Sequence, residues 1–448
     1  MTVLPSYSLL RRWSMAAAIG LPLMAAQVVV PTLFGVTLSG SAIVLAQEEQ
    51  KQEPSRETKR TQALSNKAYE KLSKAQKAAE EKDYSGAIRI LDEMTKGSTK
   101  PNDFELANAL NLYAFIYYTK EDYPSAIAAY KKILMLPGAP EGMLTQARYQ
   151  MAQLYFVTDQ WQQGIDALLA WFKVTPEPGA NAYILLAQAY FQLNKFDLAL
   201  KNVDIGVAMK REGGKTPDEN ALNLQRYLYQ EKGDNKKVLA ILNEMLLHYP
   251  KKQYWLNLSQ VYGELKDDGK QLAALEAADR QNMLNAEGEI VNLTYLFLMN
   301  DVPYKAAKNL ESGMKQKQVK ETAKNLELLG NAWRQARELD KAIPVMVRAA
   351  KASDKGELWA QLGNVYLDDD QYQEAIDAVT QAFKKGGVKR PDTANLVLGT
   401  AYFNLKKYDS ARKAFKLAGK DKRSKPYVDQ WIKYMDSELQ RQQSLQQG

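Results

Sequence analysis

The sequence of 448 residues contains no cysteine and a single histidine, His248. The absence of cysteine excludes disulfides, thiolate metal sites, iron–sulfur clusters and cysteine nucleophiles from this chain. One histidine is too few for a metal site of several imidazoles or for a pair of histidine acid–base groups. Most hydrolase and metalloenzyme mechanisms therefore lose their usual residues, and the composition predicts a protein that is not an enzyme and uses no cofactor or metal.

Sequence motifs for catalysis are missing as well. The chain has no nucleotide-binding P-loop, no G-x-S-x-G and no H-E-x-x-H motif. The acidic run Asp368–Asp370 falls in a predicted turn between helices, where carboxylates are commonly solvated. His248 stands beside Tyr249 and Pro250 near a predicted helix end, where an imidazole usually caps the helix or faces solvent.

The N-terminal part of the chain has the order of residues of a bacterial export signal. Arg11 and Arg12 precede an uncharged stretch from Trp13 to Gln47, which ends near the small residues expected at a cleavage site after Ala46. The stretch is longer than an ordinary signal, so an uncleaved membrane anchor is the alternative. In both cases the basic residues stay in the cytoplasm, which predicts a periplasmic location for the rest of the chain. Membrane contact is expected only through a signal that is retained.

The positive charge of the chain is concentrated near its C-terminus. Lysine and arginine exceed aspartate and glutamate by 8 overall, and residues 401–448 alone hold 11 basic against 5 acidic residues. A patch that includes Lys420, Lys422, Arg423 and Lys425 can attract acidic partners or anionic lipid, or it can simply be a solvated helix face. No aromatic–basic motif accompanies the patch, so a nucleic-acid partner is not expected.

A repeat of 33 to 39 residues runs through most of the chain. Its position is marked by a residue, here called the anchor, that belongs to a recurring tyrosine-x-x-alanine pattern. Nine intervals of similar length indicate ten copies of one structural unit. The ten anchors are Ala87, Ala126, Gly164, Ala199, Val238, Gln271, Ala306, Ala342, Ala375 and Ala411.

Further columns of residues keep the same register. Three residues before most anchors the side chain is bulky and apolar, and twelve residues before most anchors it is small, as at Gly330, Gly363 and Gly399. Small residues allow two helices to approach closely, and Arg226 and Thr294 are the exceptions in this column. Nine residues before nine of the anchors the side chain is aromatic: Tyr117, Tyr155, Tyr190, Tyr229, Tyr262, Phe297, Trp333, Tyr366 and Tyr402.

Each unit is predicted to be two helices joined by a short polar turn, such as Lys82-Asp83. In the unit from Trp359 to Ala382 the apolar residues recur at i, i+3, i+4 and i+7, and no strand alternation competes with this spacing. These residues resemble the tetratricopeptide repeat. The resemblance implies an all-α, right-handed superhelical solenoid of about ten helix–turn–helix units, in which neighbouring units bury each other's apolar faces.

Four segments follow from this reading. Residues 1–46 are the predicted export signal, 47–62 a charged flexible linker, 63–423 the tetratricopeptide array, and 424–448 a C-terminal capping helix with a Gln-rich tail. The capping helix is predicted from an apolar stripe that would otherwise have no partner: Tyr427, Trp431, Ile432, Met435 and Leu439.

Candidate binding residues are first-helix positions that lie between the packing columns and are expected to face the inner groove of the superhelix. Aromatic and amide side chains there suit an extended or helical peptide, with Gln153 and Gln188 pairing to its backbone, although extra packing between helices is the alternative. A carboxylate clamp for chaperone tails is not expected, because the clamp positions hold no lysine or arginine. The candidates are Asn111, Phe115, Tyr118, Gln153, Phe156, Gln188, Phe191 and Tyr227.

Longer stretches resemble one group of tetratricopeptide proteins over roughly residues 56–434. The segments are Arg56–Thr61, Tyr249–Trp255, Gln271–Ala277, Asp301–Ala307 and Thr322–Gly330. The group consists of periplasmic proteins that are encoded with a second TonB–ExbB–ExbD energy-transduction cluster in marine gammaproteobacteria. The resemblance implies a noncatalytic helper in TonB-dependent uptake of iron complexes, with TonB, ExbB or ExbD-type inner-membrane proteins as partners, and it supplies no binding residues.

Two other functions fit the same sequence. One is a scaffold for envelope or cell-wall assembly, which needs the same export signal and protein-binding array. The other is a glycan-binding accessory module of an enzyme, in which the aromatic residues stack on sugar rings.

Overall fold

The computed structural model describes residues 63–98 and 100–447, which divide into two compact units at Lys232 and Gly233. The predicted signal and linker, residues 1–46 and 47–62, lie outside the described residues. The described residues form helices and no strand, so the all-α prediction is confirmed. Among them, no helix combines the length and the apolar character needed to traverse a bilayer.

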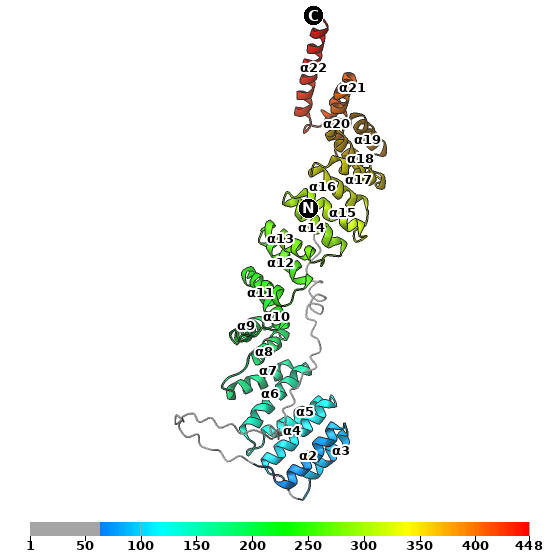
Figure 1. Ribbon diagram of the computed structural model, residues 1–448. Coiled ribbons are helices and arrows are strands. Elements are labelled where there is room, and N and C mark those ends of the chain that lie inside the picture. The colour runs from blue at the N-terminus through cyan, green and yellow to red at the C-terminus, as the bar shows by residue number, and fades with distance from the viewer. Residues whose placement is uncertain (1–62, 99, 448) are drawn as a thin grey trace, which may run out of the picture. The chain divides into compact units, whose positions relative to one another are not determined.

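Unit 1 contains four complete helical hairpins and one further helix (Figure 1). Each hairpin packs against the next one in the chain. The helices are α2 (Asn66–Glu80), α3 (Tyr84–Thr95), α4 (Asp103–Thr119), α5 (Tyr123–Leu134), α6 (Glu141–Val157), α7 (Trp161–Val174), α8 (Ala180–Gln192), α9 (Phe196–Glu212) and α10 (Glu219–Glu231).

Unit 2 begins with one helix, continues with five hairpins that stack in chain order, and ends with a single long helix. Its helices are α11 (Asn235–His248), α12 (Lys252–Glu264), α13 (Asp268–Arg280), α14 (Glu287–Met299), α15 (Pro303–Lys315), α16 (Ala323–Gln335), α17 (Leu339–Ala352), α18 (Glu357–Asp368), α19 (Tyr372–Lys385), α20 (Pro391–Asn404), α21 (Tyr408–Ala418) and α22 (Lys425–Gln447).

Residues of the columns found in the sequence make the contacts between the two helices of a hairpin. Every anchor is the fourth residue of a second helix, and anchors such as Ala126 and Ala375 are fully buried. A Cβ atom added to Gly363 would lie 2.5 Å from Cγ2 of Val379, so the first helix lies close against the second at this position. Small residues in this column are therefore required by the interhelical distance, as predicted.

Thr294 shows how a polar residue is accommodated in the small column. Its side chain is fully buried, its hydroxyl donates to the carbonyl oxygen of Ile290 at 2.9 Å, and it accepts from Nδ2 of Asn309 at 2.9 Å. Because both the donor and the acceptor of the hydroxyl are satisfied, burial there leaves no orphaned polar group.

The turn between the two helices of each repeat has one backbone conformation at all ten repeats. The residue five positions before the anchor is left-handed, with φ between 56° and 70°, although Gly233 is the one glycine among the ten. In eight of these turns the amide of the following residue donates to the backbone carbonyl oxygen of an aromatic-column residue, as when Asp122 N–H donates to the carbonyl oxygen of Tyr117 at 2.8 Å. This backbone arrangement ends the first helix and reverses the chain.

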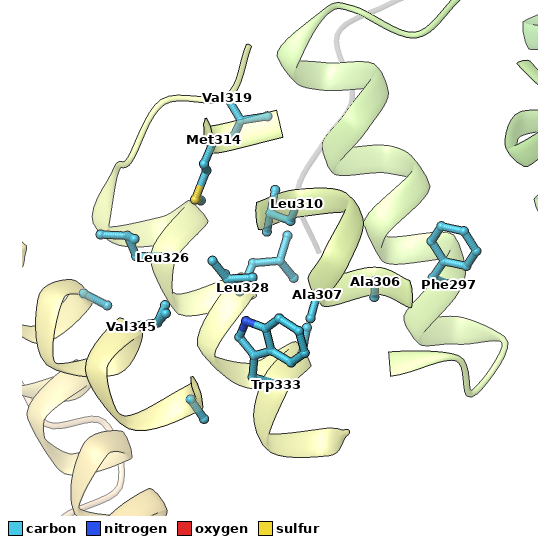
Figure 2. Packing of buried hydrophobic residues seen from close by; sticks show 14 of the residues in the cluster. Phe297, Ala306, Ala307, Leu310, Met314, Val319, Leu326, Leu328, Trp333 and Val345 are labelled. Atoms are coloured by element: carbon cyan, nitrogen blue, oxygen red, sulfur yellow. The ribbon is translucent and has the colours of Figure 1, made fainter. Parts of the chain in front are cut away.

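The core of unit 2 includes three apolar clusters between successive hairpins, of which the first contains buried residues from Leu272 to Ala378. Figure 2 shows Trp333 of α16 next to Ala307 of α15, with Leu310 and Leu328 nearby, and the Trp333 side chain is fully buried. Large aromatic rings in one helix thus fill the space that small residues leave in the next, which gives the dense packing expected of a protein interior.

Helix α22 covers the last hairpin, as the apolar stripe predicted. Val428 and Met435 are buried, and Trp431 stacks on Phe415 of α21 with ring centroids 5.5 Å apart. The helix continues through Gln447, so the Gln-rich end has helical backbone.

Candidate binding face

The predicted binding residues all lie on first helices of unit 1. Seven of the eight are half-buried, and Phe156 is buried, with 7% of its surface exposed. Half-buried side chains on a rigid helix can lose further surface to a ligand at little cost in conformational entropy. The set is distributed over α4 (Asn111, Phe115, Tyr118), α6 (Gln153, Phe156), α8 (Gln188, Phe191) and α10 (Tyr227).

Two aromatic side chains of this face pair with a ring across the turn of their hairpin, in α4–α5 and α8–α9. Tyr118 packs on Tyr123 with ring centroids 6.0 Å apart, and Phe191 packs on Phe196 at 5.6 Å. In both hairpins the first ring stands eight residues before the anchor and the second stands three residues before it. The left-handed turn brings these two positions together, so the pairing follows from the hairpin geometry.

Tyr118 keeps a polar group on this face. Burial raises the pKa of its phenol, and the neighbouring Tyr123 adds to this effect. The hydroxyl therefore stays protonated at neutral pH and can donate or accept a hydrogen bond. An aromatic body with a polar tip is the side-chain type that recurs at protein interfaces.

Phe156 occupies an internal position, in contrast to the open groove position that we predicted. Its ring stacks on Trp161 at 6.0 Å and lies over Gly164, where an added Cβ would be 2.3 Å from Cε1 of Phe156. The other anchors have side chains, and glycine here opens room for the ring. The glycine at an anchor position is the sequence signal for this burial.

Phe191 and Tyr227 are the predicted residues that the structure brings together. Their rings meet edge to face with centroids 5.5 Å apart, and they connect α8 to α10. Within the described residues, no ring contact or hydrogen bond joins Asn111, Phe115, Gln153 or Gln188 to another candidate. These four residues lie on first helices of the same unit as the aromatic pairs, but they do not form one contiguous site with them.

A second aromatic cluster in unit 1 was missed by the repeat analysis. Tyr149 packs on Trp171 at 4.8 Å, and Phe172, next in the chain, packs on Tyr183 at 4.9 Å, so the cluster links α6, α7 and α8. All four side chains are half-buried. They lie outside the repeat columns, and the Trp171-Phe172 pair is the local signal that could have identified them.

The structure supports no metal site within the described residues, where no group of three or more potential metal-ligating side chains comes together. His248 is exposed at the last residue of α11, which confirms the predicted surface position at a helix end. The acidic run Asp368–Asp370 begins at the last residue of α18 and continues into the turn before α19, close to the predicted position.

Comparison with known proteins identifies the repeat directly in two segments. Residues 361–424 match a family model described as tetratricopeptide repeat, and residues 180–202 match a second model with the same description. The first match contains the predicted α18–α19 unit from its Gln361 onward. No curated protein matches the sequence.

Several solved structures are similar in part. A tetratricopeptide repeat protein from Parabacteroides merdae is 16% identical and covers 64% of this chain and 94% of its own, with a TM-score of 0.33. MamA from Desulfovibrio magneticus is 18% identical and covers 41% of this chain and 96% of its own, with a TM-score of 0.33. Cut9, from the APC/C hetero-tetramer Cut9–Hcn1, is 14% identical and covers 83% and 91%, with a TM-score of 0.31.

These likenesses are too distant to transfer a partner or an activity. The two matched segments identify tetratricopeptide repeats at residues 180–202 and 361–424, and the same turn conformation recurs between the paired helices elsewhere in both units.

Proposed function

We propose that the chain is a noncatalytic scaffold that binds a peptide segment of a protein partner on the first-helix face of unit 1. The observation that carries the proposal is the set of half-buried aromatic side chains at Phe115, Tyr118, Phe191 and Tyr227. Tyrosine and other aromatic residues dominate the binding energy of protein interfaces, because they bury a large area with few rotatable bonds.

The cellular setting of the proposal comes from the sequence. The predicted export signal at residues 1–46 supports a periplasmic location, and the segments that resemble TonB-associated tetratricopeptide proteins support a role in energy transduction for iron-complex uptake. The partners proposed are inner-membrane proteins of the TonB, ExbB or ExbD type. N-terminal sequencing of the chain recovered from cell fractions tests the location, and a cytoplasmic chain with an intact N-terminus would refute it.

The binding face is tested with Phe191→Ala. This substitution removes the ring that connects Phe196 and Tyr227, and we expect at least tenfold weaker capture of the partner with unchanged helix content. Capture is measured by cross-linking in cells followed by identification of the enriched proteins. Leu198→Ala is the control, because Leu198 is an exposed apolar residue on α9, a second helix of the same unit.

Phe156→Ala distinguishes binding from folding. Since Phe156 is buried against Trp161 and Gly164, its loss is expected to lower the stability of unit 1 by about 3 kcal/mol.

Equal capture by wild type and Phe191→Ala would refute the binding face. Enrichment of cell-wall proteins in place of TonB-type partners would redirect the proposal to an envelope scaffold.

The glycan-binding alternative rests on the aromatic cluster of Tyr149, Trp171, Phe172 and Tyr183. Titration with cell-wall glycan fragments, followed by tryptophan fluorescence, tests it. A saturable response that is lost in Trp171→Ala supports sugar stacking. The absence of a response in the wild-type protein refutes it.

A further inference from the structure

The loops that connect successive hairpins in the C-terminal half of unit 2 are strongly basic. Four windows, residues 315–325, 351–357, 384–392 and 420–425, contain 14 lysines and arginines against 5 aspartates and glutamates. All 14 basic side chains are exposed. We call these four windows the basic edge. The corresponding loops of unit 1, residues 96–105, 135–141, 173–180 and 210–219, contain 6 basic and 7 acidic residues, so the charge is specific to unit 2.

Hydrogen bonds join the second, third and fourth loops of the basic edge to one another. The amide of Gly356 donates to the carbonyl oxygen of Gly386 at 2.7 Å, and Lys385 Nζ donates to the carbonyl oxygen of Ser353 at 2.7 Å. Ser424 Oγ donates to Asp392 at 2.8 Å, which joins the third loop to the fourth. Glu321 in the first loop pairs with Arg348, one turn before the second loop.

Most acidic residues of the basic edge have a hydrogen-bond or ion-pair partner, whereas most of its lysines have no ion-pair partner. Asp392 is held by Arg390 and Ser424, Asp421 by Arg423, and Glu357 accepts the amide of Lys389. Among the described residues, ten of the lysines have no carboxylate oxygen within 4.0 Å. Their positive charge therefore faces solvent without compensation. The ten are Lys317, Lys320, Lys324, Lys351, Lys355, Lys384, Lys385, Lys389, Lys420 and Lys422.

Helix stabilisation explains only part of this pattern. Lys315, Lys351, Lys384 and Lys420 stand at or just beyond the C-terminal ends of α15, α17, α19 and α21, where a cation offsets the negative end of the helix dipole. Lys385, the last residue of α19, is in the same position, and the remaining lysines of the basic edge stand in the loops or in the first turns of the following helices. The dipoles of the second helices give no reason for these additional charges.

The opposite ends of the same hairpins have the opposite charge balance. The turns inside the five hairpins, residues 265–270, 300–305, 335–341, 368–374 and 404–409, contain 7 basic and 10 acidic residues. We call these five windows the turn edge. The two edges of unit 2, at opposite ends of its helices, therefore carry net charges of opposite sign. A negatively charged surface would attract the basic edge and repel the turn edge.

We propose that the basic edge of unit 2 lies on an anionic lipid bilayer surface. Lysine outnumbers arginine twelve to two, and both arginines are already engaged with Asp392 and Asp421 in two-bond contacts. Arginine can bind a single phosphate or carboxylate through two parallel hydrogen bonds, but both guanidinium groups here are already bound to aspartates. The lysines that lack an ion-pair partner act as point charges, which suit a surface with spread negative charge.

Exposed apolar side chains within this charge pattern favour a bilayer over a soluble polyanion. Phe383 is 38% exposed beside Lys384, Leu417 is 49% exposed one turn before Lys420, and Tyr427 is 62% exposed two residues after Lys425. A bilayer offers an interface into which such side chains insert while the lysines remain among the headgroups. An acidic peptide or a nucleic acid offers no such medium.

The proposal is tested by sedimentation of the full chain with vesicles. One vesicle type is pure phosphatidylcholine, and the other has about one-third phosphatidylglycerol, both in about 50 mM salt. The apolar residues 13–47, where present, contribute to both vesicle types, so the difference between the vesicles isolates the electrostatic part. We expect preferential binding to the anionic vesicles and loss of this preference as salt is raised.

The decisive variant combines Lys384→Gln, Lys389→Gln, Lys420→Gln and Lys422→Gln. Each lysine near an anionic surface strengthens binding about fivefold, so we expect binding to anionic vesicles to weaken at least a hundredfold. The matched control combines Lys236→Gln, Lys266→Gln, Lys406→Gln and Lys407→Gln, which removes the same net charge at or beside the turns within hairpins. We expect the control to bind within threefold of wild type.

Three results would overturn the proposal. One is equal binding of the wild-type chain to the two vesicle types. Another is an equal loss of vesicle binding in both variants, which would show that binding depends on the net charge of the chain and not on the basic edge. The third is failure to bind vesicles together with salt-sensitive binding of poly-glutamate that the first variant loses, which would assign the edge to an acidic protein. Thermal unfolding of both variants should match wild type, because the substituted side chains are exposed.

Discussion

The left-handed residue at each hairpin turn is occupied by lysine, glutamate, aspartate, asparagine, arginine or glycine. A left-handed backbone costs a residue with a side chain roughly 1 kcal/mol or more. Nine of the ten turns bear this cost, and the surrounding hydrogen bonds and helix packing hold the conformation. Because no single residue type occupies this position in all ten turns, side-chain columns in the sequence do not show this feature.

Lys82→Gly is expected to stabilise unit 1. Lys82 has φ 64° and an exposed side chain, so glycine removes the backbone strain, while its greater freedom in the unfolded chain offsets part of the gain. We expect a net gain of about 0.5 kcal/mol in the free energy of unfolding, measured by urea denaturation. Lys74→Gly, in the exposed middle of α2, should instead lose about 1 kcal/mol. A loss in both variants would contradict this account.

Asp392 is the buried charge that links the last hairpin to α22. The side chain of Arg390 donates at 2.9 and 2.6 Å and Ser424 donates at 2.8 Å, and these bonds hold the pKa of Asp392 well below its ordinary value. A carboxyl group with a lowered pKa stabilises the fold above the pKa of the unfolded chain, about 4. This stabilisation is lost as pH falls below that value.

Asp392→Asn should lower the stability of unit 2 by about 2 kcal/mol at neutral pH, because the charge-assisted bonds are weakened. The difference between wild type and variant should shrink as pH falls below about 4, because Asp392 of the unfolded chain then takes up a proton while Asp392 of the folded chain, with its lowered pKa, stays ionised. Chemical denaturation of both proteins at pH 7 and at successively lower pH measures this difference. A difference that is independent of pH would show that the charge of Asp392 does not contribute.

At the scale of elements, α22 depends on a few side chains. Met435 is fully buried, whereas Lys433, two residues earlier on the same helix, is exposed. The helix must cover the last hairpin because repeat stacks expose an apolar face wherever they end.

Met435→Ala is expected to destabilise the docking of α22 by about 3 kcal/mol. Lys433→Ala, the control on the same helix, should change stability by less than about 0.5 kcal/mol. Amide hydrogen exchange in α21 and α22 measures the effect, and protection of these two helices should fall in Met435→Ala alone. Equal protection in the two variants would show that α22 is not held by this contact.

At the scale of the whole molecule, stability in a repeat protein is close to a sum of contacts between neighbouring hairpins. Damage at one hairpin is therefore expected to spread to its neighbours and to fade with distance along the chain. The division into units at Lys232 and Gly233 provides a reference region for such a measurement.

Ala375→Trp should overpack the fully buried anchor of the α18–α19 hairpin and cost about 3 kcal/mol or more. We expect faster amide exchange in the hairpins on either side, α16–α17 and α20–α21, and unchanged exchange in α2 to α5. Uniform acceleration across both units would contradict nearest-neighbour stability and indicate one cooperative fold.

The sequence alone determined the hairpins, their number and their register. Small residues such as Ala375 and Gly363 and the aromatic column repeat because each hairpin solves the same packing problem with the same interhelical distance. Periodicity of this kind is local, so it can be read without knowledge of the fold. The C-terminal cap was predictable for the same reason, since an apolar stripe such as that of Trp431 and Met435 requires a partner.

Only the tertiary structure decided which side chains stay available at the surface. Phe156 and Phe191 occupy the same repeat position, yet Phe156 is buried over Gly164 and Phe191 is half-buried beside Tyr227. The basic edge likewise forms from loops about 35 residues apart, which stacking brings into hydrogen-bond contact. Exposure and charge neighbourhood depend on residues distant in the chain, and the repeat pattern carries no information about them.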